Sequence, residues 1–358
     1  MHREIIDGSD VLWASPKDNL NVTSRSASAS TSATATLPTV KGLLFLAHGC
    51  GHSNDDWFSK SSEKGCEGCR GLPEERAIVE TALELGLVAI AMSSSNWSTK
   101  CWNAFDITPV ALVLNELGHR FSQAEAEERG ATATKSPLPL YAFGASSGGA
   151  FVSSLANPLR SRFGIHLDGF VSQIAARLPL QTEEQQEDPN LCKVYITMNR
   201  DEETNRRAKL RMRECISVDV DHNNTSTNAD SGELESKRCK HIRLTTLPVT
   251  PSYFADRIPE ISQAESEQMV KVLTEEEYLL PPFGTPVEDP RKSQIWSDAL
   301  WSASSPLLRF QERGDLLVAD KSPIFEVMNV AWGFHEMSRD GVREALAFCF
   351  AHRQQLKS

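Results

Sequence analysis

A serine inside a Gly-x-Ser-x-Gly motif is the residue of this sequence most suited to nucleophilic chemistry. An apolar run at 140–143 leads into Gly144, Ser146 and Gly148, and apolar residues at helical spacing follow. So tight a strand-to-helix turn strains the serine backbone, and glycines on either side let the chains pass. The turn exposes the hydroxyl beside free N–H groups of the next helix. The motif predicts a nucleophile at Ser146; a glycine-rich turn that binds a phosphate is the alternative.

A second glycine-rich turn predicts where an oxyanion would bind. The apolar run Gly42–Ala47 ends in the sequence His-Gly-Cys-Gly-His at 48–52. His-Gly-x-Gly turns of this kind supply one oxyanion donor in esterases, and the residue after the nucleophile supplies the other. We therefore expect the backbone N–H groups of Ser147 and Cys50 to form the oxyanion hole. The alternatives are Gly49 or Gly51 as donor, and a plain tight turn with a structural His48.

Four residues on loops at the carboxyl ends of strands are expected to line the substrate pocket: His48, Gly49, Trp97 and Trp102. Ligands bind at that edge of open α/β sheets. Tryptophans that pack beneath their loop are the alternative interpretation.

A general base and its acidic partner follow later in the chain. His335 stands on a turn before the last predicted helix, and Asp201 comes just after the apolar run 192–198. Asp201 would then share the strand edge of Ser146, whereas Asp168 begins its strand at the opposite edge. Geometry favours Asp201. Other histidines compete with His335: His48, His52, His222 and His241.

Alternating patterns along the chain predict the fold. Apolar runs at 42–47, 87–92, 140–145, 167–174 and 192–198 alternate with helical patterns at 73–85, 108–121 and 202–216. Strands that alternate with helices favour right-handed crossovers. We expect an α/β fold with a doubly wound, mostly parallel sheet.

The expected organisation has four parts. Residues 1–39 read as a short strand and a low-complexity loop, and 40–249 as the core. Residues 250–321, rich in proline and acids, read as a cap-like insertion over the site, and 322–358 as the last part of the core with His335.

Charge and hydropathy narrow the class of protein. A net charge of −11 argues against nucleic acid or an anionic membrane as partner. The sequence has no apolar run of membrane-spanning length, and acids occupy the N-terminal stretch where a signal peptide is apolar. We expect a cytoplasmic or otherwise soluble intracellular protein.

Eight cysteines leave three alternatives open. Cys66 and Cys69 have the spacing of a metal or redox pair, but zinc sites usually show a second such pair. A disulfide among Cys50, Cys66, Cys69 and Cys101 is the second alternative, and free thiols are the third. We expect no metal and no cofactor.

The order Ser146, Asp201, His335, with the serine motif and the 48–52 turn before them, resembles the α/β-hydrolase superfamily over about residues 40–200 and 322–353. Further residues resemble a poorly characterised group of plant and algal hydrolase-like proteins: His48–Ser53, Cys66, Cys69, Gly71–Glu75, Cys101, Trp102 and Phe334–Met337.

The resemblance implies a Ser-His-Asp hydrolase that cleaves a carboxylic ester or related acyl bond of a small molecule through an acyl-enzyme. The alternatives are a non-catalytic ligand-binding protein of the same fold, an acyltransferase, a C–C bond hydrolase and a peptidase. The sequence does not specify the acyl chain or the oligomeric state.

Overall fold

An eight-stranded sheet forms the centre of the protein in the computed structural model, which describes residues 1–19, 39–62, 65–128, 137–176, 188–221, 236–281, 284–305, 307–308 and 322–357. The strand order is β1-β2-β4-β3-β5-β6-β7-β8, and all pairs from β4 to β8 are parallel. The strands are β1 (His2–Ile6), β2 (Ser9–Ala14), β3 (Gly42–Ala47), β4 (Leu87–Met92), β5 (Leu140–Ala145), β6 (Gly169–Gln173), β7 (Cys192–Met198) and β8 (Cys239–Leu244).

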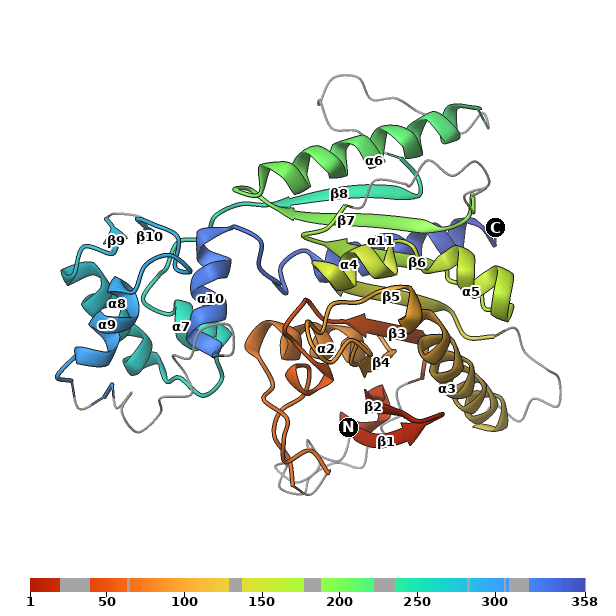
Figure 1. The fold of residues 1–358 in the computed structure, drawn as a ribbon, viewed down its shortest axis with the longest axis horizontal. Coiled ribbons are helices and arrows are strands. Elements are labelled where there is room, and N and C mark those ends of the chain that lie inside the picture. Colours follow the sequence, from red (N-terminus) through yellow and green to blue (C-terminus); the bar gives the residue numbers. More distant parts are fainter. Residues whose placement is uncertain are drawn as a thin grey trace, which may run out of the picture.

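Helices cover both faces of this sheet (Figure 1). One apolar layer contains α2 (Pro73–Glu84) and α11 (Val342–Gln355). The opposite layer contains α3 (Ile107–Glu128), α4 (Ser147–Val152), α5 (Ala156–Phe163) and α6 (Glu202–Asp221). Strands β3, β4, β5 and β7 are buried along their whole length, as strands between two helical layers must be. The predicted doubly wound, mostly parallel α/β fold is confirmed.

The N-terminal segment differs from the single strand that we expected. It forms a hairpin in which β1 pairs antiparallel with β2, and β2 pairs antiparallel with β4. Asp7 and Gly8 connect the strands with φ angles of 46° and 79°. Two successive positive φ angles are what a tight hairpin turn requires, and Asp-Gly is a favoured pair there. The low-complexity stretch 24–36 lies outside the described residues.

A third apolar cluster lies beyond the carboxyl ends of the strands, on the left of Figure 1. It joins described residues between Val249 and Leu308 to residues 324–331, so α10 packs against elements that precede it in the chain. Its elements are α7 (Tyr253–Arg257), α8 (Gln263–Glu275), β9 (Leu279–Leu280), β10 (Thr285–Pro286), α9 (Ile295–Ser302) and α10 (Pro323–Trp332).

Four disulfides join all eight cysteines: Cys50–Cys101, Cys66–Cys69, Cys192–Cys349 and Cys215–Cys239. Two of them tie a helix to a strand of the core, α11 to β7 and α6 to β8. Of the other two, Cys50–Cys101 joins the turn after β3 to the loop after β4, and Cys66–Cys69 closes a turn between β3 and α2. The structure therefore answers the open question about the cysteines in favour of disulfides, including two pairs that the sequence did not suggest.

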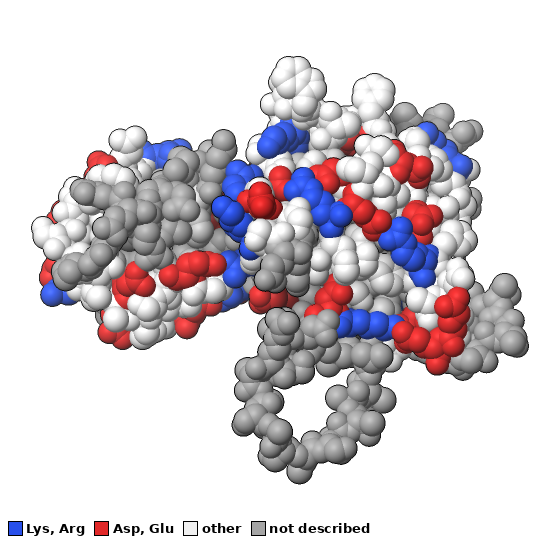
Figure 2. Space-filling view, turned by 90° about the horizontal axis from the view of Figure 1, so that it is seen from below, with Lys and Arg blue, Asp and Glu red and all other residues white. Residues whose placement is uncertain are grey.

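The outer surface carries both signs of charge. Lysine, arginine, aspartate and glutamate are interspersed on the face in Figure 2, without a broad basic field. Among the described residues, the structure contains no helix with the length and apolar character needed to cross a bilayer.

Candidate active site

The turn after β5 holds Ser146 in a strained backbone conformation, with φ 52° and ψ −116°. A side chain at either flanking glycine would not fit. A Cβ at Gly148 would collide with the backbone of Ala47 and His48, and one at Gly144 with the backbone of Gly148. The three chain segments therefore pack directly on one another. Strain of this kind persists where the surrounding structure fixes it, and it presents the Ser146 hydroxyl at the sheet edge.

The structure brings Ser146, His335 and Asp201 together from distant parts of the chain. Ser146 Oγ lies 3.0 Å from His335 Nε2, and His335 Nδ1 lies 2.8 Å from Asp201 Oδ2. With the Nδ1–H tautomer, the imidazole donates to Asp201 and accepts from the serine hydroxyl. These three side chains have the geometry of a nucleophile, a base and an orienting carboxylate.

Thr204 fixes the carboxylate of Asp201. Its hydroxyl donates to Asp201 Oδ2 at 2.7 Å, and its backbone N–H donates to Oδ1 at 3.1 Å. Burial by itself raises the pKa of Asp201, but the hydrogen bonds from His335 and Thr204 outweigh burial, and the net pKa is lowered. Asp201 is therefore held ionised and oriented toward the imidazole.

The turn that carries His335 is tied to its neighbours at several points. Gly333 and His335 have φ angles of 74° and 43°, so the chain reverses sharply after α10. Arg291 donates to the carbonyl oxygens of Phe334 and His335 at 2.8 and 3.0 Å. These bonds fix the turn that places the imidazole of His335 next to Ser146. The same turn brings His335 to Asp201, although 134 residues of sequence separate the two.

The register of the sheet brings the 48–52 turn to Ser146. Ala47 on β3 pairs with Gly144 on β5. Gly49 and Ser146 each follow two positions later, just past the ends of these strands, so they lie side by side. Accordingly, a Cβ at Gly49 would stand 3.8 Å from Cβ of Ser146. The backbone of this turn thus lies beside Ser146, and α4 begins at the next residue, Ser147.

Three contacts hold this turn against the loop after β4. Cys50 is bonded to Cys101, Gly51 N–H donates to Thr99 O at 3.0 Å, and Trp102 Nε1–H donates to the carbonyl oxygen of His48 at 3.0 Å. The loop therefore supports the backbone position of the expected second oxyanion donor.

A pocket of about 670 Å³ opens above Ser146 and His335, within the usual range for small-molecule sites. Gly49, Cys50 and Phe325 are among its walls. Three residues that we expected there are elsewhere. His48 is fully buried, Trp102 packs beneath its loop against Phe45 and Phe151, and the side chain of Trp97 is exposed, with 89% of its surface accessible.

The competing residues have other partners in the structure. His48 bonds with the backbone of Gly49 and Ser94, and burial lowers its pKa to about 4. His241 on β8 lies 2.8 Å from Oγ1 of Thr197 on β7. Asp168 receives a hydrogen bond from Arg353 at 2.6 Å at the opposite strand edge. His222 lies outside the described residues, and His52 lines the pocket beside Asp56.

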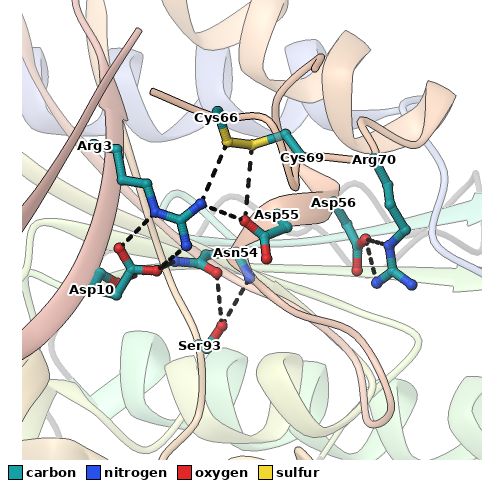
Figure 3. A network of polar contacts seen from close by, with 9 residues as sticks. All are labelled: Arg3, Asp10, Asn54, Asp55, Asp56, Cys66, Cys69, Arg70 and Ser93. Carbon is teal, nitrogen blue, oxygen red and sulfur yellow. Dashed lines mark hydrogen bonds and ion pairs between the residues drawn. A yellow bond between two sulfur atoms is a disulfide. The ribbon is translucent and has the colours of Figure 1, made fainter. Parts of the chain in front are cut away.

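A polar network anchors the segment 54–70 next to the pocket (Figure 3). Arg3 binds Asp10 and Asp55, and its Nη1 lies 3.7 Å from Cys66 Sγ. The Cys66–Cys69 bond faces the same Asp55 carboxylate. Because both sulfurs are in a disulfide, neither is a thiolate that could ligate zinc.

Several residues that shape the site were absent from the sequence-based list. Thr204 follows Asp201 at the spacing of a helix N-cap and its third residue, which is a recognisable signal. Glu75 looked like an ordinary acid in the first turn of a helix, and Gln173 and Glu326 carried no local signal because their partners are far away in sequence.

Comparison with known proteins gives structural matches only; no family model and no curated protein matches. A dienelactone hydrolase from Anabaena variabilis is 14% identical over 58% of this chain and 76% of its own, with a TM-score of 0.32. A serine hydrolase without a lid from Xanthomonas campestris is 11% identical over 68% and 84%, with a TM-score of 0.34. An esterase from Pseudomonas putida is 11% identical over 66% and 73%, with a TM-score of 0.33.

These similarities are too weak to assign an activity or to carry an argument about the fold. The features of the chain itself define the fold. The strand order, the strained serine between β5 and α4, and the Ser-Asp-His order around one sheet edge are the defining features of one architecture. On these features the chain has the fold of the α/β-hydrolase superfamily.

Proposed function

We propose that the protein is a serine hydrolase that cleaves a carboxylic ester of a small molecule. Ser146 acts as nucleophile, His335 as general base and Asp201 as the group that orients the imidazole. The observation that supports the proposal most is the unbroken relay from the hydroxyl through the imidazole to the carboxylate, with distances of 3.0 and 2.8 Å. Ser146 and His335 line one pocket, so the relay can act on an ester bound there.

The reaction then follows from the positions of these groups. His335 Nε2 takes the hydroxyl proton as Ser146 Oγ attacks the ester carbonyl, and the tetrahedral oxyanion accepts hydrogen bonds from the N–H groups of Ser147 and Cys50. The imidazolium gives its proton to the leaving alcohol, which leaves an acyl-serine. Water, deprotonated by His335, attacks the acyl-serine and releases the carboxylic acid and the free serine.

Labelling with a fluorophosphonate probe tests this function. We expect wild type to label, and Ser146→Ala and His335→Ala to lose labelling and at least about 10⁴-fold of p-nitrophenyl acetate turnover. Ser154→Ala, which removes an exposed serine on the segment after α4, is the matched control and should label like wild type. Folded wild-type protein that does not label, or a Ser146→Ala variant that labels, would contradict the proposal.

We also infer an oxidising compartment for the protein; of the locations expected from the sequence, the cytoplasm is not such a compartment. Four disulfides join its cysteines, whereas glutathione keeps most cytosolic thiols reduced. A thiol count on denatured, unreduced protein from its native source tests this inference. We expect fewer than one free thiol per chain; eight would contradict it.

A further inference from the structure

We propose that Lys100 and His52 form a subsite of the pocket that binds a carboxylate of the substrate, beside the ester that Ser146 attacks. Both residues line the same pocket as Ser146 and His335. The inference adds a substrate class, esters that also carry a carboxylate, to the proposed hydrolase, and it rests on that function for the reacting group.

Two crosslinked segments bring Lys100 and His52 to the same part of the pocket. His52 ends the turn after β3, and Lys100 belongs to the loop after β4. The Cys50–Cys101 disulfide joins the two segments, one residue from Lys100 and two residues from His52. Burial lowers the pKa of His48 most, and the charges of His52 and Lys100 lower it further. Both cations therefore lie near one buried imidazole.

His52 presents a charged N–H donor to the pocket. Burial alone lowers its pKa, but the hydrogen bond to Asp56 and the charge of Glu75 outweigh burial and raise the pKa to about 9. Its Nδ1–H donates to Asp56 at 3.2 Å, while Nε2 has no hydrogen-bond partner among the described residues. A Cβ at Gly49 would lie 3.8 Å from His52 Cδ2 and 3.8 Å from Ser146 Cβ. The ring edge that carries Cδ2 and Nε2 is thus close to the nucleophile.

Lys100 is a cation whose side chain has no acidic partner in the part of the chain that the structure describes. Its φ angle is 53°, a conformation that is uncommon for a residue with a side chain and that costs free energy. Its backbone N–H donates to Asn96 O at 2.7 Å, which helps to hold this conformation. Strain of this kind gathers at ligand sites. The loop therefore fixes the start of the lysine side chain at the pocket.

The glutamates that line the pocket are already balanced. Glu336 pairs with Arg291 at 2.6 Å. Burial and the charge of Glu75 raise the pKa of Glu326 well above its usual value, so Glu326 stays protonated and hydrogen-bonds to Glu75. The single charge of this pair faces the imidazolium of His52, whose Nδ1 lies 3.9 Å from Glu75 Oε1. The lysine is left as the charge that no neighbour balances.

One unbalanced positive charge and one imidazolium N–H suit a carboxylate. The ammonium supplies the charge, and both groups donate hydrogen bonds to the carboxylate oxygens, which are strong because they are charge-assisted. A phosphate monoester carries a charge between about −1.5 and −2 at neutral pH. Part of that charge would remain uncompensated beside Glu75 and Glu336. The arrangement therefore favours a carboxylate over a phosphate.

Calorimetric titration of Ser146→Ala tests the subsite, because this variant binds esters without cleaving them. The probes are the monomethyl esters of succinic, glutaric and adipic acids and the corresponding dimethyl esters, in which the free carboxylate is masked. Three lengths are used because the lysine stem has four rotatable bonds. Two charge-assisted hydrogen bonds should make at least one monomethyl ester bind about tenfold or more tightly than its dimethyl counterpart.

Variants made in the Ser146→Ala protein assign this preference to its residues. In Lys100→Met we expect the affinities of the two esters to agree within threefold, and Lys100→Arg should keep most of the preference. His52→Leu should reduce the preference at least about threefold. Lys41→Met, at an exposed lysine just before β3 on the opposite edge of the sheet, is the matched control and should keep it in full. Equal affinities for every ester pair, or a preference that survives Lys100→Met or His52→Leu, would overturn the proposal.

Steady-state kinetics with the active serine present give a second measurement. Lys100→Met should lower kcat/KM for the preferred monomethyl ester at least about tenfold more than for its dimethyl counterpart. The loss should lie mainly in KM, because the contact is the same in the bound substrate and in the transition state. An equal loss on both esters would mean that Lys100 acts on the oxyanion, and it would overturn the proposal.

The calorimetric titration does not depend on turnover, so the two proposals can fail separately. Protein that prefers the monomethyl ester as expected, but whose wild type does not label with a fluorophosphonate, would keep the subsite and lose the hydrolase. Protein that labels but shows no preference for the carboxylate would keep the hydrolase and lose the subsite.

Discussion

Gln173 and Ser338 exchange two hydrogen bonds that join the end of β6 to the turn carrying His335. Gln173 Nε2–H donates to Ser338 O at 2.8 Å, and Ser338 N–H donates to Gln173 Oε1 at 3.0 Å. Both residues are fully buried. The backbone oxygen of Gln173 also accepts from Ser146 N–H at 3.0 Å. One residue thus fixes the distance between the turn of the nucleophile and the turn of the base.

Replacing Gln173 by leucine should damage the relay without touching its members. The substitution keeps the volume but leaves a backbone N–H and a backbone C=O of Ser338 buried without partners, at a cost of about 2–4 kcal/mol in the free energy of unfolding. We expect kcat for p-nitrophenyl acetate to fall at least about tenfold. Urea denaturation and steady-state kinetics measure the two effects, with the exposed Gln123→Leu as control. Unchanged kcat in folded protein would show that this bond pair does not position His335.

The contact between Gly148 and the end of β3 predicts a strong effect of one methyl group. In Gly148→Ala the added Cβ would overlap the backbone of Ala47 and His48, which cannot move without shifting the strand. We expect a loss of about 3 kcal/mol or more in stability, or no folded protein. Gly68→Ala adds the same methyl group where nothing lies within 4 Å, and should stay within about 0.5 kcal/mol of wild type. Similar stabilities of the two variants, by thermal or urea denaturation, would contradict the close packing.

The bond between Cys50 and Cys101 should matter for rate more than for binding. It fixes the loop whose Cys50 N–H is the proposed second oxyanion donor. Replacing both residues by serine keeps the backbone N–H but frees its position. Since one such donor contributes about 10²–10³ in rate, we expect kcat to fall about tenfold or more with KM within threefold. The matched Cys66→Ser and Cys69→Ser pair lies outside the pocket and should leave kcat within twofold. Equal effects of the two pairs would argue against the donor role of the loop.

The sequence predicts the core of this fold well because its signals are local. Apolar runs mark β3, β4, β5 and β7 to within a residue, since strands buried on both faces have few polar positions. The Asp-Gly pair at residues 7 and 8 is a local signal for a hairpin turn. The prediction of a single N-terminal strand overlooked this signal. In the segment 250–305, Ser262 and Glu265 form a capping box that begins α8, a second signal that the proline content obscured.

The residues of the site likewise divide into those that a local sequence pattern predicts and those that it does not. The motif around Ser146 and the strand end before Asp201 are short patterns, and they pointed to residues that the structure brings together. The pocket walls were not predictable, because burial depends on contacts between distant segments. Trp97 and Trp102 stand on the same polar loop of the sequence, yet Trp97 is exposed and Trp102 lies under the loop. Glu75 and Glu326 meet across 251 residues of sequence, and no periodicity records such a contact.

Thr204 should stabilise the protein in a way that depends on pH. Asp201 has a lowered pKa in the folded protein, so its ionised form contributes stability above the unfolded value of about 3.9. That contribution is lost as the pH falls through the lower folded value. Thr204 Oγ1–H donates to this carboxylate at 2.7 Å. Thr204→Val removes the donor and keeps the shape, so we expect a loss of about 1 kcal/mol at pH 7 that shrinks below pH 4. Urea denaturation from pH 3 to 7 measures it, and Thr204→Ser, which keeps a hydroxyl, should recover most of the loss. A difference between wild type and Thr204→Val that stays constant over this range would mean that the valine acts through packing and not through the charge of Asp201.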